Sequence, residues 1–125
     1  MSYKEPTIIM NDNVAYFDVD DTLLMWTWSP EHDHEAIEIQ LSFDRPVARV
    51  VPHKIHIERL IRHKMIGNAV VVWSRSGWQW AQAAVFALGL QQHVDACMAK
   101  PFYHYDDKKC CDILGEHRYI PYGNT

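Results

Sequence analysis

Short apolar runs alternate along this chain with segments whose apolar residues recur at helical spacing. Residues 14–17 form a β-branched and aromatic run directly after the turn signal at residues 11–13, which predicts a buried strand. Residues 69–73 are continuously apolar, as expected of a strand covered on both faces in a parallel sheet. Residues 94–99 and 102–105 predict a third and a fourth strand.

Two helices are predicted between these strands. The first begins after Pro52 and ends at Gly67, and the second ends at Gly89. Their apolar positions are Ile57, Leu60, Ile61 and Met65 in the first helix, and Trp78, Ala81, Ala84, Val85 and Leu88 in the second. Strands that alternate with helices indicate βαβ units with right-handed crossovers, in which ligands collect beyond the carboxyl ends of the strands.

A β-hairpin is predicted between the first strand and the first helix. Residues 35–42 alternate between apolar and polar side chains, residues 43–46 interrupt the alternation, and residues 47–51 again have a strand-like composition. One face of such a hairpin is expected to be exposed.

Composition and charge narrow the class of protein. The chain has 125 residues, 48% of them apolar and 22% charged, which is typical of a single soluble globular domain. The net charge of −4 gives no support to a broad surface for binding nucleic acid phosphates. Three cysteines imply no disulfide framework and favour a reducing cytoplasm, and no segment has the apolar length of a signal peptide or membrane span.

Residues 17–26, FDVDDTLLMW, place three carboxylates within four positions at the end of the first predicted strand. Neighbouring carboxylates repel each other unless a cation or a shared proton relieves them. In an extended segment side chains at i and i+2 point the same way, so we expect Asp18 and Asp20 to face one ligand while Val19 packs behind them. A hard, oxygen-preferring cation such as Mg²⁺ suits this pattern.

Further polar residues follow the other predicted strands. They are Ser74 and Arg75 after the second, Lys100 after the third, and Asp106 and Asp107 after the fourth. In this order FDVDDT, VVVWS, AKP and YDD resemble the four motifs of the haloacid dehalogenase-like superfamily, over about residues 14 to 107. The fourth motif departs from the common G-D-x-x-x-D form, because it has paired aspartates.

The resemblance implies a fold and a reaction. The fold is α/β, a Rossmann-like three-layer α/β/α arrangement over residues 1–125, with a mainly parallel sheet, a flap hairpin at about residues 26–52 and no separate cap. The reaction is Mg²⁺-dependent hydrolysis of a phosphate monoester through an aspartyl-phosphate. Asp18 is the expected nucleophile and Asp20 the general acid and base, the group that separates a phosphatase from a dehalogenase.

The resemblance also implies the remaining roles. Catalysis would use Asp18, Asp20, Ser74 and Lys100, with Ser74 and Lys100 holding the phosphoryl group. Expected substrate-binding residues are Thr22, Trp26, Ser74, Arg75 and Lys100. Expected Mg²⁺ ligands are Asp18, Asp20 through its backbone carbonyl, and Asp106, with Asp107 supporting the site.

The sequence does not determine the substrate or the partners. Trp26 and Trp28 favour a nucleotide or a polynucleotide end, and a sugar phosphate is the alternative. Without a cap, the site would accept large substrates or be covered by a neighbour in a homo-oligomer. A catalytically silent module that binds phosphoryl groups is the rival function, and no membrane partner is expected.

Simpler interpretations apply to single residues. A carboxylate cluster after a strand is often a solvated turn, Ser74 a helix cap and Lys100 a surface residue. The pairs His32/His34 and His53/His56 suggest transition-metal ligands but lack residues to complete a tetrahedral set. We expect Cys110 and Cys111 to be buried structural residues in a short helix, and most tryptophans to pack in the core.

Overall fold

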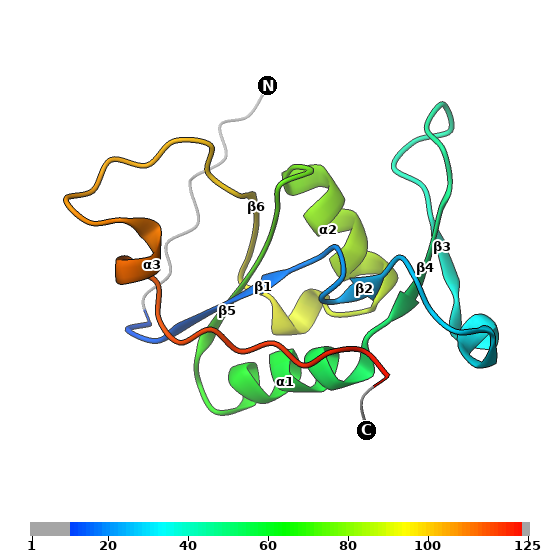
Figure 1. The fold of residues 1–125 in the computed structure, drawn as a ribbon, viewed down its shortest axis with the longest axis horizontal. Helices are drawn as coiled ribbons and strands as arrows, with labels where there is room; N and C mark the ends of the chain where they lie inside the picture. Colours follow the sequence, from blue (N-terminus) through cyan, green and yellow to red (C-terminus); the bar gives the residue numbers. More distant parts are fainter. Residues whose placement is uncertain (1–10, 124–125) are drawn as a thin grey trace.

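Two small sheets, one parallel and one antiparallel, organise residues 11–123, which are the residues that the computed structural model describes (Figure 1). The parallel sheet contains β1 (Val14–Asp18), β5 (Ala69–Ser74) and β6 (Ala96–Ala99), in the order β1-β5-β6. Phe17 pairs with Val72, and Val72 pairs with Cys97. The first three predicted strands and their parallel arrangement are therefore confirmed.

The antiparallel sheet contains β2 (Leu24–Met25), β4 (Ala48–Pro52) and β3 (Ile37–Ile39), in the order β2-β4-β3. The predicted hairpin is confirmed as β3 and β4, but its first strand is shorter than expected. A 3₁₀ helix, η1 (Pro30–Glu35), occupies the segment before it and begins with a proline. Proline is favoured in the first turn of a helix because its fixed φ suits that position and its missing N–H is not needed there.

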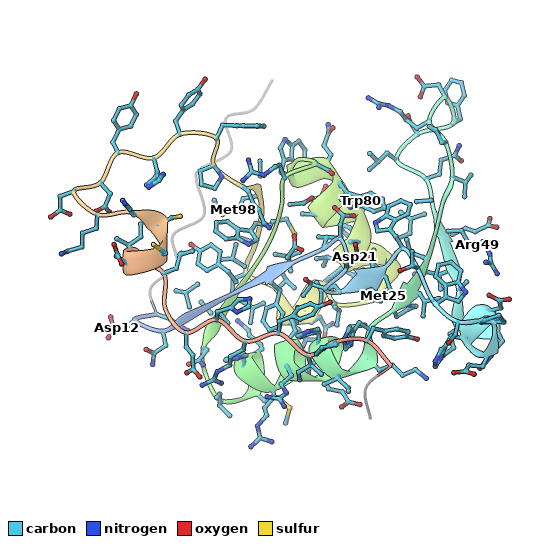
Figure 2. The ribbon with its side chains drawn as sticks, viewed as in Figure 1. Asp12, Asp21, Met25, Arg49, Trp80 and Met98 are labelled. Atoms are coloured by element: carbon cyan, nitrogen blue, oxygen red, sulfur yellow. The ribbon has the colours of Figure 1, made fainter. Side chains whose placement is uncertain are left out.

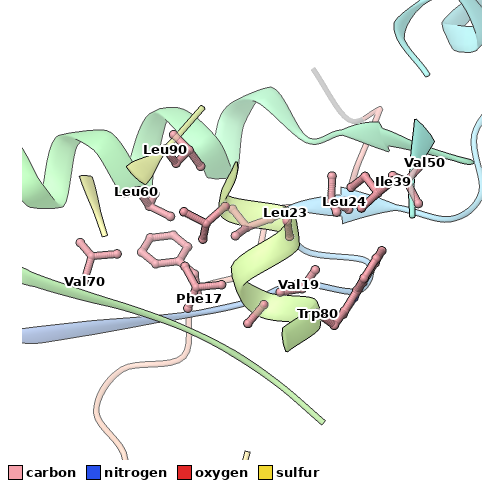
Figure 3. Packing of buried hydrophobic residues seen from close by; sticks show 14 residues of the cluster. Phe17, Val19, Leu23, Leu24, Ile39, Val50, Leu60, Val70, Trp80 and Leu90 are labelled. Atoms are coloured by element: carbon pink, nitrogen blue, oxygen red, sulfur yellow. The ribbon is translucent and has the colours of Figure 1, made fainter. Parts of the chain in front are cut away.

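The helices α1 (Lys54–Met65) and α2 (Trp78–Ala87) lie where the sequence predicts them, and a short 3₁₀ helix, η2 (Gln91–His93), follows α2. The chain moves across the parallel sheet in one direction, from β1 to β5 to β6, so right-handed crossovers place both helices on the same face. Figure 3 shows the resulting core, in which Phe17 and Val70 of the sheet join Leu60 of α1 and Trp80 of α2.

The opposite face of the parallel sheet is open in part. Side chains alternate between the two faces of a strand, and Val14, Tyr16 and Met98 remain 39%, 47% and 39% exposed. The last helix, α3 (Cys110–Ile113), has four residues, none of them buried. Residues 11–123 thus form a small α/β unit with its two long helices on one face, and the expected three-layer arrangement is not confirmed.

The prediction of a fourth strand at residues 102–105 is wrong. These residues follow β6 as irregular chain, and Phe102, Tyr103 and Tyr105 are exposed. Aromatic residues favour a strand only where a neighbouring strand and a packed face receive them, and this segment has neither in the described part of the chain. Asp106 and Asp107 therefore do not stand at the end of a strand.

The structure also bears on the cysteines and on membrane-spanning helices. Cys110 and Cys111 are exposed, so the expectation that they are buried is wrong. Cys97 is half-buried, and this burial raises the pKa of its thiol. Within residues 11–123 no helix combines the length and the apolar character that crossing a membrane requires.

Candidate functional site

A tight turn, residues 18–24, leaves the carboxyl end of β1; we call it the carboxylate turn. The carbonyl of the fully buried Val19 accepts hydrogen bonds from the N–H groups of Thr22, Leu23 and Leu24 at 3.2, 3.0 and 3.0 Å. Asp21 has a φ of 60°, in the left-handed region that aspartate tolerates better than most residues. Val19 and Leu23 anchor the turn in the core, and the carboxylates between them remain outside it.

Asp18 is bonded through both carboxylate oxygens. Lys100 Nζ lies 3.0 Å from Oδ1, and the Thr22 hydroxyl donates to Oδ2 at 3.1 Å. The Asp18 and Lys100 side chains remain 31% and 26% exposed, so a ligand can reach the pair from solvent. The structure thus brings together residues of the first and third motifs, as the sequence predicts.

Asp20 has its own donors. The indole N–H groups of Trp26 and Trp80 both donate to its Oδ1, at 2.8 and 3.0 Å. Within residues 11–123, Asp20 Oδ2 accepts no hydrogen bond, which leaves that oxygen open to a ligand. The role of Trp80 had no signal in the sequence, because its position 60 residues away on α2 is typical of a core residue.

Asp21 connects the turn to the carboxyl-terminal segment of the chain. Its Oδ1 accepts the N–H of Trp26 at 3.1 Å, and its carbonyl accepts the Tyr119 hydroxyl at 2.9 Å. In Figure 2, Asp21 and Trp80 lie at one end of β1, and Asp12 lies at the other. The contact with Tyr119 spans 98 positions of sequence, so no local pattern could have indicated it.

The two buried histidines at the start of α1 hold the same segment. His53 Nε2 lies 2.8 Å from the Ile120 carbonyl, and the Ile120 N–H donates to His56 Nε2 at 3.1 Å. Burial lowers the pKa of His56, as does the neighbouring His53, which suits its role as a neutral acceptor. These ring nitrogens serve the backbone of Ile120 and are not arranged as metal ligands.

The second motif points into the fold. Ser74 is fully buried, and its position along β5 places it on the same face as Val70 and Val72, toward the helices. Its hydroxyl accepts the N–H of Ser76 at 3.0 Å, and its carbonyl accepts the N–H of Lys100 at 3.0 Å. This arrangement favours positioning of Lys100 over the direct phosphate contact expected of Ser74.

Other expected substrate-binding residues lie at the surface. The Arg75 guanidinium lies 5.4 Å from the Phe102 ring, a cation–π contact. Trp26 is 44% exposed beside the carboxylate turn. The Trp28 indole N–H donates to Asp33 at 2.5 Å and Arg49 lies over its ring, so Trp28 belongs to the η1 and hairpin region.

The expected fourth motif is not joined to the others. Asp106 and Asp107 are exposed, and the Lys108 N–H donates to Asp106 Oδ1 at 3.0 Å. This bond, together with a hydrogen bond from the Asp107 side chain, holds the pKa of Asp106 below its ordinary value. Within the described residues no group of three or more His, Cys, Asp or Glu side chains is arranged to hold a metal ion.

Mg²⁺ commonly binds through one or two protein carboxylates, several waters and a substrate phosphate. The Asp18 carboxylate is a partly exposed oxygen donor of this type, and the backbone carbonyl of Asp20 is a second oxygen donor on the same short turn. The donor chemistry of the carboxylate turn therefore fits Mg²⁺ held by one carboxylate and one carbonyl, which leaves the Asp20 carboxyl free for proton transfer.

The structure therefore assembles one polar site at the carboxyl end of the parallel sheet, made of the carboxylate turn, Lys100 and the two indoles that hold Asp20. Comparison of this chain with protein-family models, with curated proteins and with solved structures finds no match in any of the three.

Proposed function

We propose that the protein is a Mg²⁺-dependent phosphomonoesterase with Asp18 as its nucleophile. One observation carries the proposal: the ion pair between Asp18 and Lys100, next to Asp20 and at the carboxyl end of a parallel sheet. Ligands of open α/β sheets bind at that end of the strands. A carboxylate held beside a lysine and a second carboxylate is suited to attack on phosphorus and to proton transfer.

The reaction has two steps. An oxygen of Asp18 attacks the phosphorus of the monoester, the bond to the leaving oxygen breaks, and Asp20 gives that oxygen a proton. Asp20 then takes a proton from water, whose oxygen attacks the aspartyl-phosphate and releases inorganic phosphate and free Asp18. Lys100 offsets the negative charge gathered around the phosphoryl group.

The remaining residues support these groups. Thr22 fixes the second oxygen of Asp18, and Ser74 fixes the backbone at Lys100. Mg²⁺ would be held by the Asp18 carboxylate and the Asp20 backbone carbonyl and would supply charge neutralisation when bound. Asp106 and Asp107 could join this set only if the exposed segment after β6 approached the carboxylate turn, so we keep them as proposed ligands to be tested by Asp106→Asn.

The test is hydrolysis by the purified full chain. Substrates are an aryl phosphate, nucleotides, sugar phosphates and 3'-phosphorylated DNA, each with and without Mg²⁺. We expect Asp18→Asn to lower kcat by at least ~10³-fold, since it removes the nucleophile. Asp12→Asn, at the other end of β1, is the matched control and should retain activity. Absence of hydrolysis of every substrate at every Mg²⁺ concentration would rule out the enzyme.

A phosphoryl-binding module without turnover is the second candidate. It is favoured by the fact that both oxygens of Asp18 are already bonded, to Lys100 and Thr22. Calorimetric binding of inorganic phosphate that depends on Lys100, with no hydrolysis of any ester, would support the module and exclude the phosphatase.

A further inference from the structure

A pocket of about 270 Å³ opens between the indoles of Trp26 and Trp80 and the hairpin of β3 and β4. Most residues that line the pocket are apolar or aromatic, and one, Arg45, has a positively charged side chain. The lining includes Trp26, Trp80, Ile39, Leu41, Arg45 and Val47. None of the proposed catalytic groups lines the pocket directly, so it is a compartment beside the site and not the site itself.

The two indoles connect this pocket to the proposed chemistry. Trp26 and Trp80 line it with their side chains, while their N–H groups both donate to Asp20 Oδ1. The ring centroids are 6.1 Å apart with an interplanar angle of 32°. A group in the pocket therefore contacts the same two side chains that hold the proposed general acid.

The hairpin wall has apolar surface that the described fold leaves uncovered. Leu41 and Val47 lie on the connection between β3 and β4 and are 45% and 50% exposed. Apolar side chains that line a hollow beside aromatic rings offer favourable burial to an apolar ligand. Arg45 forms no ion pair with any residue in 11–123, so its charge is available to a polar or anionic substituent of that ligand.

From these contacts we infer that the pocket receives the leaving group of the phosphate monoester, and that this leaving group carries a planar aromatic ring. The inference rests on the proposed phosphatase activity and specifies its substrate class. The pocket is slightly below the usual size range of ligand sites, ~300–1,000 Å³, which suits one ring system. A sugar would bring several hydroxyl groups to walls that are mainly apolar, where unpaired polar groups are costly.

The shared chemistry has two sources, a nucleobase and a simple aryl group, which the experiment separates. Adenosine 5'-monophosphate, phenyl phosphate and glucose 6-phosphate are hydrolysed by wild type and variants at one Mg²⁺ concentration. We expect the two aromatic esters to exceed the sugar ester in kcat/KM by about tenfold or more. Arg45→Ala should weaken hydrolysis of the nucleotide only if a nucleobase is the native group, and should leave phenyl phosphate unchanged.

The pocket wall is tested with Leu41→Ser combined with Val47→Ser. Both side chains are half-exposed, so the fold should tolerate the change, which circular dichroism and urea unfolding check. We expect KM for the aromatic esters to rise about tenfold and the values for glucose 6-phosphate to stay the same. Phe43→Ser, at the 96% exposed tip of the hairpin and outside the pocket, is the matched control. An equal change for all esters, or no change, would overturn the inference.

A readout without turnover separates this inference from the proposed function. Adenosine and phenol, which carry no phosphate, are titrated into the full chain while tryptophan fluorescence is recorded, because Trp26 and Trp80 line the pocket. Quenching that weakens in the Leu41/Val47 variant supports the pocket even if no ester is hydrolysed. Hydrolysis without preference for aromatic esters, and without quenching, would leave the phosphatase in place and remove the aromatic pocket.

Discussion

Two lysine–aspartate ion pairs lie near opposite ends of the parallel sheet. Lys100 Nζ is 3.0 Å from Asp18 Oδ1 at the carboxyl end, and Lys64 Nζ is 2.7 Å from Asp95 Oδ1 near the amino ends of β5 and β6. All four side chains are exposed to a similar degree, between 26% and 36%. By distance and exposure alone, the two pairs would be assigned the same role.

The second oxygen of each aspartate separates them. Asp95 Oδ2 accepts the N–H of the buried Val70 at 2.7 Å, and the Asp95 N–H donates to the Val70 carbonyl at 2.8 Å. Burial acts to raise the pKa of Asp95, but the bonds from Lys64 and Val70 outweigh it and hold the pKa below its ordinary value. Among residues 11–123, the second oxygen of Asp18 accepts only the Thr22 hydroxyl, a group that can rotate.

The comparison shows why an ion pair by itself says little about function. The Asp95 pair links the start of β6 to β5, because the Asp95 carboxylate also accepts the backbone N–H of Val70. In the described part of the chain the Asp18 carboxylate accepts no backbone N–H, and it lies at the end of the strands where α/β sheets bind their ligands. The two ion pairs therefore differ in their position in the sheet and in the group that bonds the second carboxylate oxygen of the aspartate.

The largest expected difference between the two pairs is catalytic. Lys100→Ala should lower kcat/KM for the best aryl phosphate by about 10²–10³-fold, since it removes a preorganised cation from the proposed phosphoryl site. Lys64→Ala should leave kcat/KM within about twofold of wild type, because Lys64 lies at the other end of the sheet. Steady-state kinetics measure both, and equal losses in the two variants would contradict the assignment.

For the stability of the fold, the Asp95 pair should matter more than the Asp18 pair. Asp95→Ala leaves the buried N–H of Val70 without an acceptor, and we expect a loss of about 1–3 kcal/mol in the free energy of unfolding. Asp18→Ala removes a partly exposed ion pair and should cost no more than ~1 kcal/mol. Urea unfolding of both variants measures these losses, and a larger loss of unfolding free energy for Asp18→Ala would show that the carboxylate turn also supports the fold.

Acid should weaken the Asp95 pair in a defined range of pH. Because the pKa of Asp95 in the folded chain lies below the ordinary 3.8, the unfolded chain binds the proton first as pH falls. The contribution of Asp95 to stability is therefore present above pH 3.8 and lost below it. Lys64→Ala should make the fall in unfolding free energy as pH drops below 3.8 smaller. Lys109→Ala, at an exposed lysine that forms no ion pair within residues 11–123, is the control, and an unchanged slope in Lys64→Ala would refute this linkage.

The smallest expected effect concerns the support of the carboxylate turn by the carboxyl-terminal segment. Tyr119→Phe removes only the hydroxyl that donates to the Asp21 carbonyl, and at this exposed position we expect a loss of about 0.5–1 kcal/mol. Tyr105→Phe, on a side chain that is 98% exposed, should change nothing measurable. Amide hydrogen exchange should rise within residues 18–24 in Tyr119→Phe alone, and unaltered exchange there would show that Tyr119 does not steady the turn.

The sequence by itself determined the elements that local pattern controls. The strands β1 and β5, the helices α1 and α2 and the hairpin lie close to where apolar periodicity and turn residues place them. It also placed Asp18 and Thr22 within one turn, close enough for their hydrogen bond. The same reasoning failed at residues 102–105, because strand-forming residues require a neighbouring strand and a covered face, and composition cannot supply either.

Only the tertiary structure decided which distant groups meet. Trp80 reaches Asp20 because α2 packs on the helix-covered face of the sheet, 60 residues along the chain from the carboxylate it holds. Ser74 is fully buried because its place along β5 aims it at that same face, while Asp18 meets Lys100 instead. Periodicity states which face of its own element a residue occupies, but the packing of elements against one another determines what that face contacts.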